Sequence, residues 1–359
     1  MLGQQVMPSY LQGKKATDNP VNQQGRIVQI ARLAGIFDCE GCFYLNRYGR
    51  SHDCYSVVAR VSNSNMRIIE EVCSTLSVLG FKYNRTDGLP TGMGGRVSEI
   101  RLHGTKRAKP LIELIAPYLS AKSRVTDLLK MFWERRDSVA YGASYTEEDF
   151  RIHRAVRAVN SNGTAKDIPV GDHLELVGPS RVARLGEVEA KAKLAAIVEC
   201  DGSLGLTNLR NGENYMPAIY MVNTNESLLA EIRQSLAMLG IPYYFQMRPP
   251  RGISIKAIGE FHIQGMKRAK RFLDAIGDYF VAYAERAKLI RQFINRRLSL
   301  PANYPYSEVE REIKRALDEE KPKSDSLQRL HAEPGKSRMI QSVLHGDMQT
   351  AAEMTAALA

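Results

Sequence analysis

The two halves of this sequence repeat each other. The segment 61–81, VSNSNMRIIEEVCSTLSVLGF, returns at 221–241 as MVNTNESLLAEIRQSLAMLGI. The segment 99–119, EIRLHGTKRAKPLIELIAPYL, returns at 260–280 as EFHIQGMKRAKRFLDAIGDYF. The units of a solenoid are only about 20–50 residues long, far shorter than the interval between these copies, so the repeat indicates a duplicated domain. Whatever fold one copy adopts, the chain contains that fold twice.

Each copy is predicted to contain elements in the order αββαββα, followed by one further helix. The spacing of apolar residues over 66–79 predicts an amphipathic helix, with Asn65 as its N-cap and Gly80 just after its end. A helix over 26–39 precedes it in the first copy, and its counterpart is predicted over 186–200. The remaining elements predicted for the first copy are strands over 42–48, 55–61, 82–86 and 97–103, and helices over 105–118 and 121–136. This order predicts an α+β fold.

The repeat also divides the chain into segments. We expect an N-terminal extension over 1–25, a first repeat over 26–136, a linker with one helix over 137–185, a second repeat over 186–300, and a C-terminal extension over 301–359. The linker helix is predicted to begin near Thr146. A second such helix is predicted after Ser307, with Ser307 and Glu310 forming a capping box.

Composition limits the classes of function. The 359 residues carry a formal charge of +11, and the pI is about 9.4. This charge favours a polyanionic partner, of which nucleic acid is the commonest. Five scattered cysteines do not resemble a disulfide framework. No apolar run reaches the ~20 residues that span a bilayer, and the first residues do not resemble a signal peptide. We therefore expect an intracellular protein, in a bacterial cytoplasm or an organelle, with no membrane partner.

Two acids, Glu40 and Asp201, occupy equivalent places at the ends of the first helix of each copy. Small residues such as Gly35 and Ala196 precede them, so the two helices are expected to pack closely as a symmetric pair. The carboxylates would then emerge together at two negative helix ends, where they repel each other. A divalent cation would relieve this repulsion, and Mg²⁺ prefers carboxylate oxygens. Asp38 and Glu199, two positions earlier, are interpreted as structural.

The predicted strands have one apolar and one polar face. In VSEIRLHG, Ile100 and Leu102 point one way, whereas Glu99, Arg101 and His103 point the other. Polar side chains on a sheet can read bases in a major groove, although a solvated face is the alternative for each of them. The other strand residues proposed as DNA contacts are Asn46, Arg60, Lys82, Asn84, Thr207, Tyr244, Gln246, Arg248, Glu260, His262 and Gln264. Lys106 and Lys267, in the repeated KRAK segments, are predicted phosphate contacts.

Two nine-residue segments carry a family resemblance. LAGIFDCEG at 33–41 and LAAIVECDG at 194–202 resemble the signature helices of the LAGLIDADG homing endonucleases, in the single-chain, two-repeat form. The resemblance implies two four-stranded antiparallel sheets that form a DNA-binding saddle, with the two signature helices at their interface. It also implies that the eighth motif residues, Glu40 and Asp201, share divalent metal, and that the protein uses this metal to cut both DNA strands across the minor groove.

The resemblance assigns further roles to individual residues. Asn63 and Asn223 occupy the position at which family members often organise the catalytic water. Arg67 is a basic residue beside the DNA, but its counterpart in the second copy is Ser227. Lys122 corresponds to a lysine that often approaches the scissile phosphate, and its counterpart is Tyr283. The second copy therefore departs from the pattern, which puts symmetric catalysis in doubt.

Together these observations predict a monomeric, site-specific endonuclease that cuts a long, non-palindromic double-stranded DNA. Such an enzyme would be encoded in a mobile intron and would need no obligate protein partner. Mg²⁺ is the expected cofactor, with Mn²⁺ as a substitute, and water is the expected nucleophile. The alternatives are an intron RNA maturase, a dual-function maturase and endonuclease, and a DNA-binding regulator without nuclease activity. An intein is disfavoured, because the splicing residues expected at the two ends are not seen.

Overall fold

The computed structural model describes residues 20–48, 54–91, 95–140, 142–160, 176, 178–209, 214–250, 256–301 and 304–319. These ranges include both predicted repeats apart from short loops. Most of the two predicted extensions, 1–25 and 301–359, and residues 161–175 of the predicted linker lie outside them. Among the described residues, no helix combines the length and the apolar character needed to cross a bilayer.

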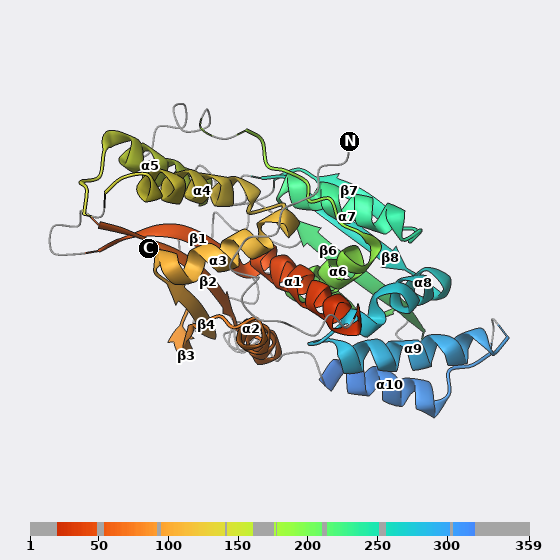
Figure 1. The fold of residues 1–359 in the computed structure, drawn as a ribbon. Helices are drawn as coiled ribbons and strands as arrows, with labels where there is room; N and C mark the ends of the chain where they lie inside the picture. The colour runs from red at the N-terminus through yellow and green to blue at the C-terminus, as the bar shows by residue number, and fades with distance from the viewer. Residues whose placement is uncertain are drawn as a thin grey trace, which may run out of the picture.

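The first repeat follows the predicted order of elements (Figure 1). Its elements are α1 (Pro20–Glu40), β1 (Gly41–Tyr48), β2 (Cys54–Asn63), α2 (Met66–Val78), β3 (Asn84–Pro90), β4 (Arg96–His103), α3 (Thr105–Ile115), the short 3₁₀ helix η2 (Ala116–Tyr118) and α4 (Ser123–Asp137). Helix α5 (Glu147–Asn160) then packs against α4.

The second repeat has the same order. It consists of α6 (Glu187–Asp201), β5 (Gly202–Asn208), β6 (Tyr215–Asn223), α7 (Glu226–Met238), β7 (Tyr244–Arg248), β8 (Ile258–Gln264), α8 (Met266–Ile276), the 3₁₀ helix η4 (Gly277–Tyr279) and α9 (Ala284–Leu298). Helix α10 (Glu308–Glu319) packs against α9, as α5 does against α4. The capping pairs are also repeated: the Thr146 amide donates to Asp149, and the Ser307 amide donates to Glu310, each over 2.7 Å.

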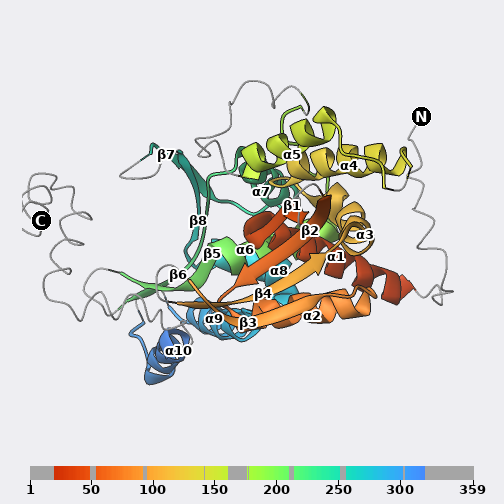
Figure 2. The ribbon, with the colours of Figure 1, turned by 90° about the vertical axis from the view of Figure 1, so that its left-hand side faces the viewer.

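The strands form two four-stranded antiparallel sheets, with the orders β1-β2-β4-β3 and β5-β6-β8-β7. Figure 2 shows the two sheets as a curved layer, with α1 and α3 on one side of it. This arrangement confirms the predicted α+β fold with two duplicated sheets.

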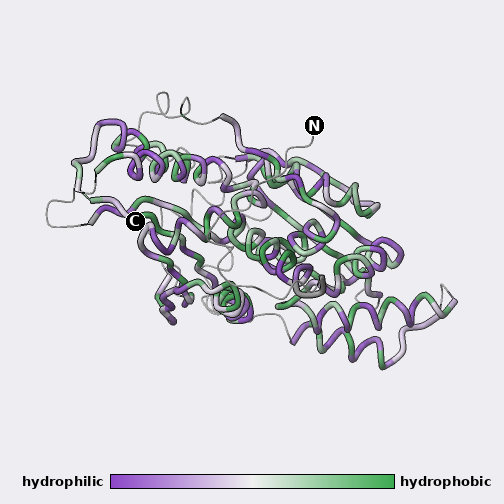
Figure 3. The backbone as a smooth tube through the Cα atoms, viewed as in Figure 1, coloured by the Kyte–Doolittle hydropathy of each residue, from purple (hydrophilic) through white to green (hydrophobic). Residues whose placement is uncertain are grey.

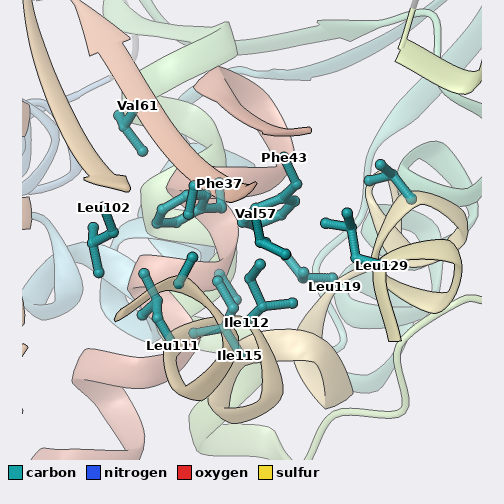
Figure 4. Close-up of a cluster of buried hydrophobic side chains, with 14 of the residues drawn as sticks. Phe37, Phe43, Val57, Val61, Leu102, Leu111, Ile112, Ile115, Leu119 and Leu129 are labelled. Carbon is teal, nitrogen blue, oxygen red and sulfur yellow. The ribbon is translucent and has the colours of Figure 1, made fainter. Parts of the chain in front are cut away.

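Each sheet buries its apolar face under helices. In the first repeat, the rings of Phe37 and Phe43 stack with centroids 5.0 Å apart, next to Val57 (Figure 4). Leu111 and Ile112 of α3 belong to the same buried cluster. Figure 3 shows the most continuous hydrophobic stretch along α1 and α6, in the middle of the molecule, whereas α5 and α10 carry many hydrophilic residues. Since α3 covers the apolar face, the opposite face of the sheet is left for polar side chains.

Helices α1 and α6 pack with almost no side chain between them. A Cβ atom at Gly35 would lie 3.0 Å from the Ala196 Cβ and 3.0 Å from the Lys193 carbonyl oxygen. Cys39 packs against the core of the second repeat, and Cys200 packs against the core of the first. The predicted contact between small residues is therefore confirmed, and it makes the two repeats share one interior.

Several predicted boundaries shift by a few residues, including the starts of α1 and β3. Helix α1 begins at Pro20, earlier than the predicted start at 26. Strand β3 begins at Asn84, so Lys82 lies in the connection before it. Both ends of α2 are as predicted. At its start, the Asn65 side chain accepts a hydrogen bond from the Arg67 amide, and after its end Gly80 has a φ of +80°. The predicted strand started too early because the alternation of apolar and polar residues continues through the turn after Gly80.

Candidate active site

Glu40 and Asp201 are the last residues of α1 and α6, and a glycine follows each of them. A Cβ atom at Gly41 would lie 2.5 Å from the Phe37 carbonyl oxygen, and one at Gly202 would lie 2.6 Å from the Tyr220 carbonyl oxygen. Only glycine fits this close approach, which turns the chain from the helix directly into a strand. The two acids are therefore held at the point where the helix pair meets both sheets.

The two carboxylates influence each other. Burial raises the pKa of Glu40 to about 7, with a further contribution from the negative charge of Asp201, while the charge of Lys122 opposes the shift. Burial also raises the pKa of Asp201, against hydrogen bonds from Cys39 and Asn223 and the charge of Lys122. A half-buried pair of acids with raised pKa values binds a proton or a cation more readily than isolated carboxylates do.

These residues fit a hard divalent cation. Within the described ranges no group of three or more His, Cys, Asp or Glu side chains converges on one point, so the protein contributes few ligands. Mg²⁺ is commonly held by one or two carboxylates, with waters and substrate phosphates completing its shell. The pair Glu40 and Asp201, which repel each other at the ends of two helices, supplies that kind of donor set.

Asn223 contacts one of the acids. Its side-chain amide donates to the Asp201 Oδ2 over 2.8 Å, and its Oδ1 accepts from the Asn225 amide over 2.7 Å. Asn63 is anchored in the same way, with its Oδ1 accepting from the Asn65 amide over 2.6 Å. The structure thus brings the predicted Asn223 to its acid and gives Asn63 the equivalent backbone anchor.

Lys122 and Tyr283 precede α4 and α9, in turns that two buried acids hold. Asp38 accepts hydrogen bonds from the amides of Ser120, over 2.9 Å, and Lys122, over 3.0 Å. Glu199 accepts from the amides of Val281 and Tyr283, each over 2.8 Å. Asp38 and Glu199 therefore have the structural role that the sequence suggested, because they position the turn that carries Lys122 or Tyr283.

Arg67 crosses from the first repeat to the second. Its guanidinium donates to the Ala282 carbonyl oxygen over 3.0 Å, next to Tyr283. Arg67 and Tyr283 line a groove of about 650 Å³, whose walls come mostly from the second repeat and partly from the start of α2. Arg67 thus contacts the turn that contains Tyr283.

The register of the first sheet places the predicted contact residues of its strands on one face. Arg60 lies opposite Arg101, and Arg101 lies opposite Asn84. The other members of this face are Asn46, Glu99 and His103. Glu99 pairs with Arg101 over 2.6 Å and with Arg60 over 3.4 Å, which fixes the two guanidinium groups relative to each other.

The second sheet repeats this arrangement with different side chains. Tyr244 lies opposite His262, and Gln246 lies opposite Glu260. The remaining predicted residues on this face are Thr207, Arg248 and Gln264. Glu260 accepts from Gln246 over 2.9 Å and pairs with Arg248 over 2.8 Å. The two polar faces thus have the same architecture and different chemistry.

Comparison with known proteins agrees with this geometry. The profile of a LAGLIDADG-like domain matches residues 28–115. The first repeat therefore contains a LAGLIDADG-like domain.

Solved structures share its fold. The LAGLIDADG homing endonuclease I-GzeII, in complex with its DNA target, is 13% identical, with a TM-score of 0.58 over 82% of this chain and 99% of the other. I-SmaMI bound to cleaved DNA is 13% identical, with a TM-score of 0.58 over 82% of this chain and 97% of the other. The meganuclease I-AabMI, bound to uncleaved DNA, is 12% identical, with a TM-score of 0.54 over 80% and 98%. No curated protein sequence matches this chain.

The interface between the two repeats also contains two buried ion clusters that the sequence analysis missed. Arg32 of α1 pairs with Glu71 and with Glu199, each over 2.5 Å. Lys193 of α6 pairs with Asp38 over 2.8 Å and with Glu231 over 2.6 Å. Each of these two cations therefore reaches across the interface between the repeats. It pairs there with the acid, Glu199 or Asp38, that anchors a turn of the other repeat. The signal was present, since Arg32 and Lys193 occupy equivalent positions of the two copies in otherwise apolar stretches.

Three of the residues predicted to contact DNA do not lie on the polar faces of the two sheets. Lys82 precedes β3 and is not part of the sheet. Lys106 and Lys267 lie in the first turns of α3 and α8, and these helices pack on the apolar side of each sheet. The presence of the KRAK segment in both copies identified exposed basic residues, but it could not show which side of the sheet their helices cover.

Proposed function

We propose that this protein is a site-specific endonuclease that hydrolyses phosphodiester bonds in both strands of a long, non-palindromic DNA duplex. The pairing of Glu40 with Asp201 at the junction of the two repeats, beside Lys122, is the observation that carries this proposal. The solved structures of similar fold that were described above are DNA complexes of homing endonucleases and meganucleases, which supports it.

The two polar sheet faces would bind the DNA. A β-sheet surface with Arg, Asn, Gln and His side chains offers donors and acceptors for base edges in the major groove. The chain's charge of +11 would add sequence-independent attraction to phosphates. Because the faces differ, as Arg101 in one repeat and His262 in the other show, the two half-sites would differ in sequence. One chain supplies both halves, so a monomer is sufficient.

Glu40 and Asp201 would hold Mg²⁺, with Mn²⁺ as a substitute, and the bound metal supplies an activated water and neutralises phosphate charge. The chain's own residues set up this chemistry. Asn223 orients the Asp201 carboxylate through its 2.8 Å hydrogen bond. Asp38 anchors the backbone of the turn that carries Lys122, and the Lys122 ammonium would stabilise the charge that develops on the phosphate. Water would be the nucleophile, without a covalent intermediate.

The presence of both acids favours an enzyme over the regulator considered above. A regulator that had lost cleavage would have no need for two half-buried carboxylates that repel each other. No contact in the described part of the chain points to intron RNA, so we do not propose the maturase role.

Selection from a randomised duplex library tests this proposal. Bound duplexes would be recovered in Ca²⁺ and then transferred to Mg²⁺ or Mn²⁺. We expect a single long consensus with two unlike halves, cut on both strands after the transfer. Selection of a consensus that the wild-type protein never cuts in either metal would reduce the protein to a DNA-binding regulator.

A further inference from the structure

Residues 178–183, GPSRVA, cross the first repeat as an extended segment, which we call the strap. The Arg181 amide donates to the Ser123 Oγ over 2.9 Å, and the Ala183 amide donates to the Ser120 Oγ over 2.8 Å. On its other side, the Ser180 carbonyl oxygen accepts from the Ser227 hydroxyl over 3.4 Å. The strap therefore lies between the start of α4 and the start of α7 (Figure 1). It covers the turn that presents Lys122.

The equivalent place in the second repeat is the groove of about 650 Å³. Its walls are the start of α9, with Ala282 and Tyr283, and the start of α2, with Arg67. When the two copies are aligned, Arg67 corresponds to Ser227 and Val281 to Ser120. Among the described residues, no counterpart of the strap lies along these walls.

The C-terminal extension contains a segment whose sequence is similar to that of the strap. Residues 335–340, GKSRMI, share Gly, Ser and Arg with GPSRVA at the same three positions. The first copy follows the end of α5 at Asn160, and the second follows the end of α10 at Glu319 after a connection of similar length. Since α10 repeats α5 down to its capping pair, the duplication extends beyond the second repeat and into the C-terminal extension.

We propose that residues 335–340 dock in the groove of the second repeat as a second strap. The distance can be covered, because a connection of about 15 extended residues spans up to about 50 Å. Asp318, near the end of α10, already lines the groove. Docking would place residues 335–340 over the turn that carries Tyr283, as the first strap lies over the turn that carries Lys122.

The residues of the groove and of the segment 335–340 both differ from their counterparts in the first repeat, and the two differences are complementary. Ser120 is fully buried under the first strap, whereas its counterpart Val281 is 45% exposed. The strap residue opposite also changes, from Ala183 to Ile340. A hydrogen-bonded contact in the first repeat is thus replaced by an apolar contact in the second, which would remove both side chains from water. Asp127, the partner of Arg181, becomes Lys288, so we expect Arg338 to pair with the exposed Glu285, one turn earlier.

Hydrogen–deuterium exchange of the full-length chain tests the proposal. We expect Ile340→Asp to speed exchange in the peptide covering 279–286 by roughly tenfold, because an uncovered turn opens more easily. Ala356→Asp adds the same charge elsewhere in the extension and should leave that peptide unchanged. Ala183→Asp is the positive control, which should speed exchange in the peptide covering 118–124 instead. Equal exchange in the wild type and in Ile340→Asp would overturn the proposal.

A crosslink gives a second, independent measurement. The pair Val281→Cys and Ile340→Cys should form a disulfide within one chain under mild oxidation, whereas Val281→Cys with Ala356→Cys should not. A disulfide that forms only between two chains, or equally in both pairs, would contradict docking within the chain. Neither measurement depends on nuclease activity, so this proposal can fail while the endonuclease stands.

Discussion

The two halves of the candidate site share a backbone frame and differ in the side chains placed on it. Both have an acid at a helix end, an asparagine anchored to a backbone amide just after it, and a turn held by a buried acid. The first repeat presents Lys122 from that turn under a docked strap, whereas the second presents Tyr283 beside a groove. The two copies therefore keep the same interactions in the frame, whereas the residues that we propose to face the DNA differ between them.

The largest expected effect is on the frame itself. Lys193→Met leaves Asp38 and Glu231 without their buried cation, and breaking such a cluster costs about 3–5 kcal/mol. Urea unfolding should show this loss in the free energy of unfolding, and Arg32→Met should show a similar one. Lys191→Met, at a half-exposed pair with Glu187 on the same helix, is the control and should cost less than about 1 kcal/mol. A loss below about 1 kcal/mol in Lys193→Met would show that the cluster does not support the interface.

The next largest effect is on the rates at which the two DNA strands are cut, which should differ between the two halves of the site. Lys122→Ala should slow cutting of one strand by about 10²–10³-fold, as expected when a charge that stabilises the transition state is removed. Tyr283→Ala should slow the other strand by less than about 10-fold, because a neutral phenol provides no such charge. Nicking of a target duplex labelled separately on each strand measures both rates. Equal slowing of both strands by both variants would show that the two halves act as one unit.

The polar faces should differ in sequence preference. Arg101→Ala should relax specificity in one half-site by about 1–3 kcal/mol per affected base pair, the range for a lost base contact. His262→Ala should act in the opposite half-site. Repeating the library selection with each variant locates the change. Unchanged consensus sequences in both would show that these faces do not read bases.

The smallest expected effect is the pH dependence that comes from Glu40. Its pKa, raised by burial and then by Asp201, is about 7 in the fold. The folded protein thus holds this proton more tightly than the unfolded chain, and the resulting stability is lost as pH rises from about 4.5 to about 7. Because the carboxylate remains partly solvated, the change should be about 1–2 kcal/mol. The free energy of unfolding, measured in EDTA at a series of pH values, should fall over this pH range in the wild type and should not show this additional fall in Glu40→Gln.

Much of this architecture could be predicted because duplication doubles every signal. The order of elements, the small residues of the helix pair and the paired acids each occur twice in the sequence. The repeated cations Arg32 and Lys193 could have been noticed, but their pairing with Glu199 and Asp38 could not be predicted, because each pair joins residues of different repeats that are far apart in sequence. The phosphate contacts of Lys106 and Lys267 stay a prediction, since the repetition of the KRAK segment does not tell which side of a sheet its helix covers.

The central claim is that Glu40 and Asp201 together carry metal-dependent cleavage. The most direct test compares the wild type, Glu40→Gln, Asp201→Asn and, as a control, Glu70→Gln, which changes an exposed acid of α2. Binding in Ca²⁺ and cleavage in Mg²⁺ would be measured on the selected target. We predict that all four proteins bind the target, and that cleavage falls by at least about 10³-fold in the two site variants alone. Cleavage at the wild-type rate by either site variant would contradict the account.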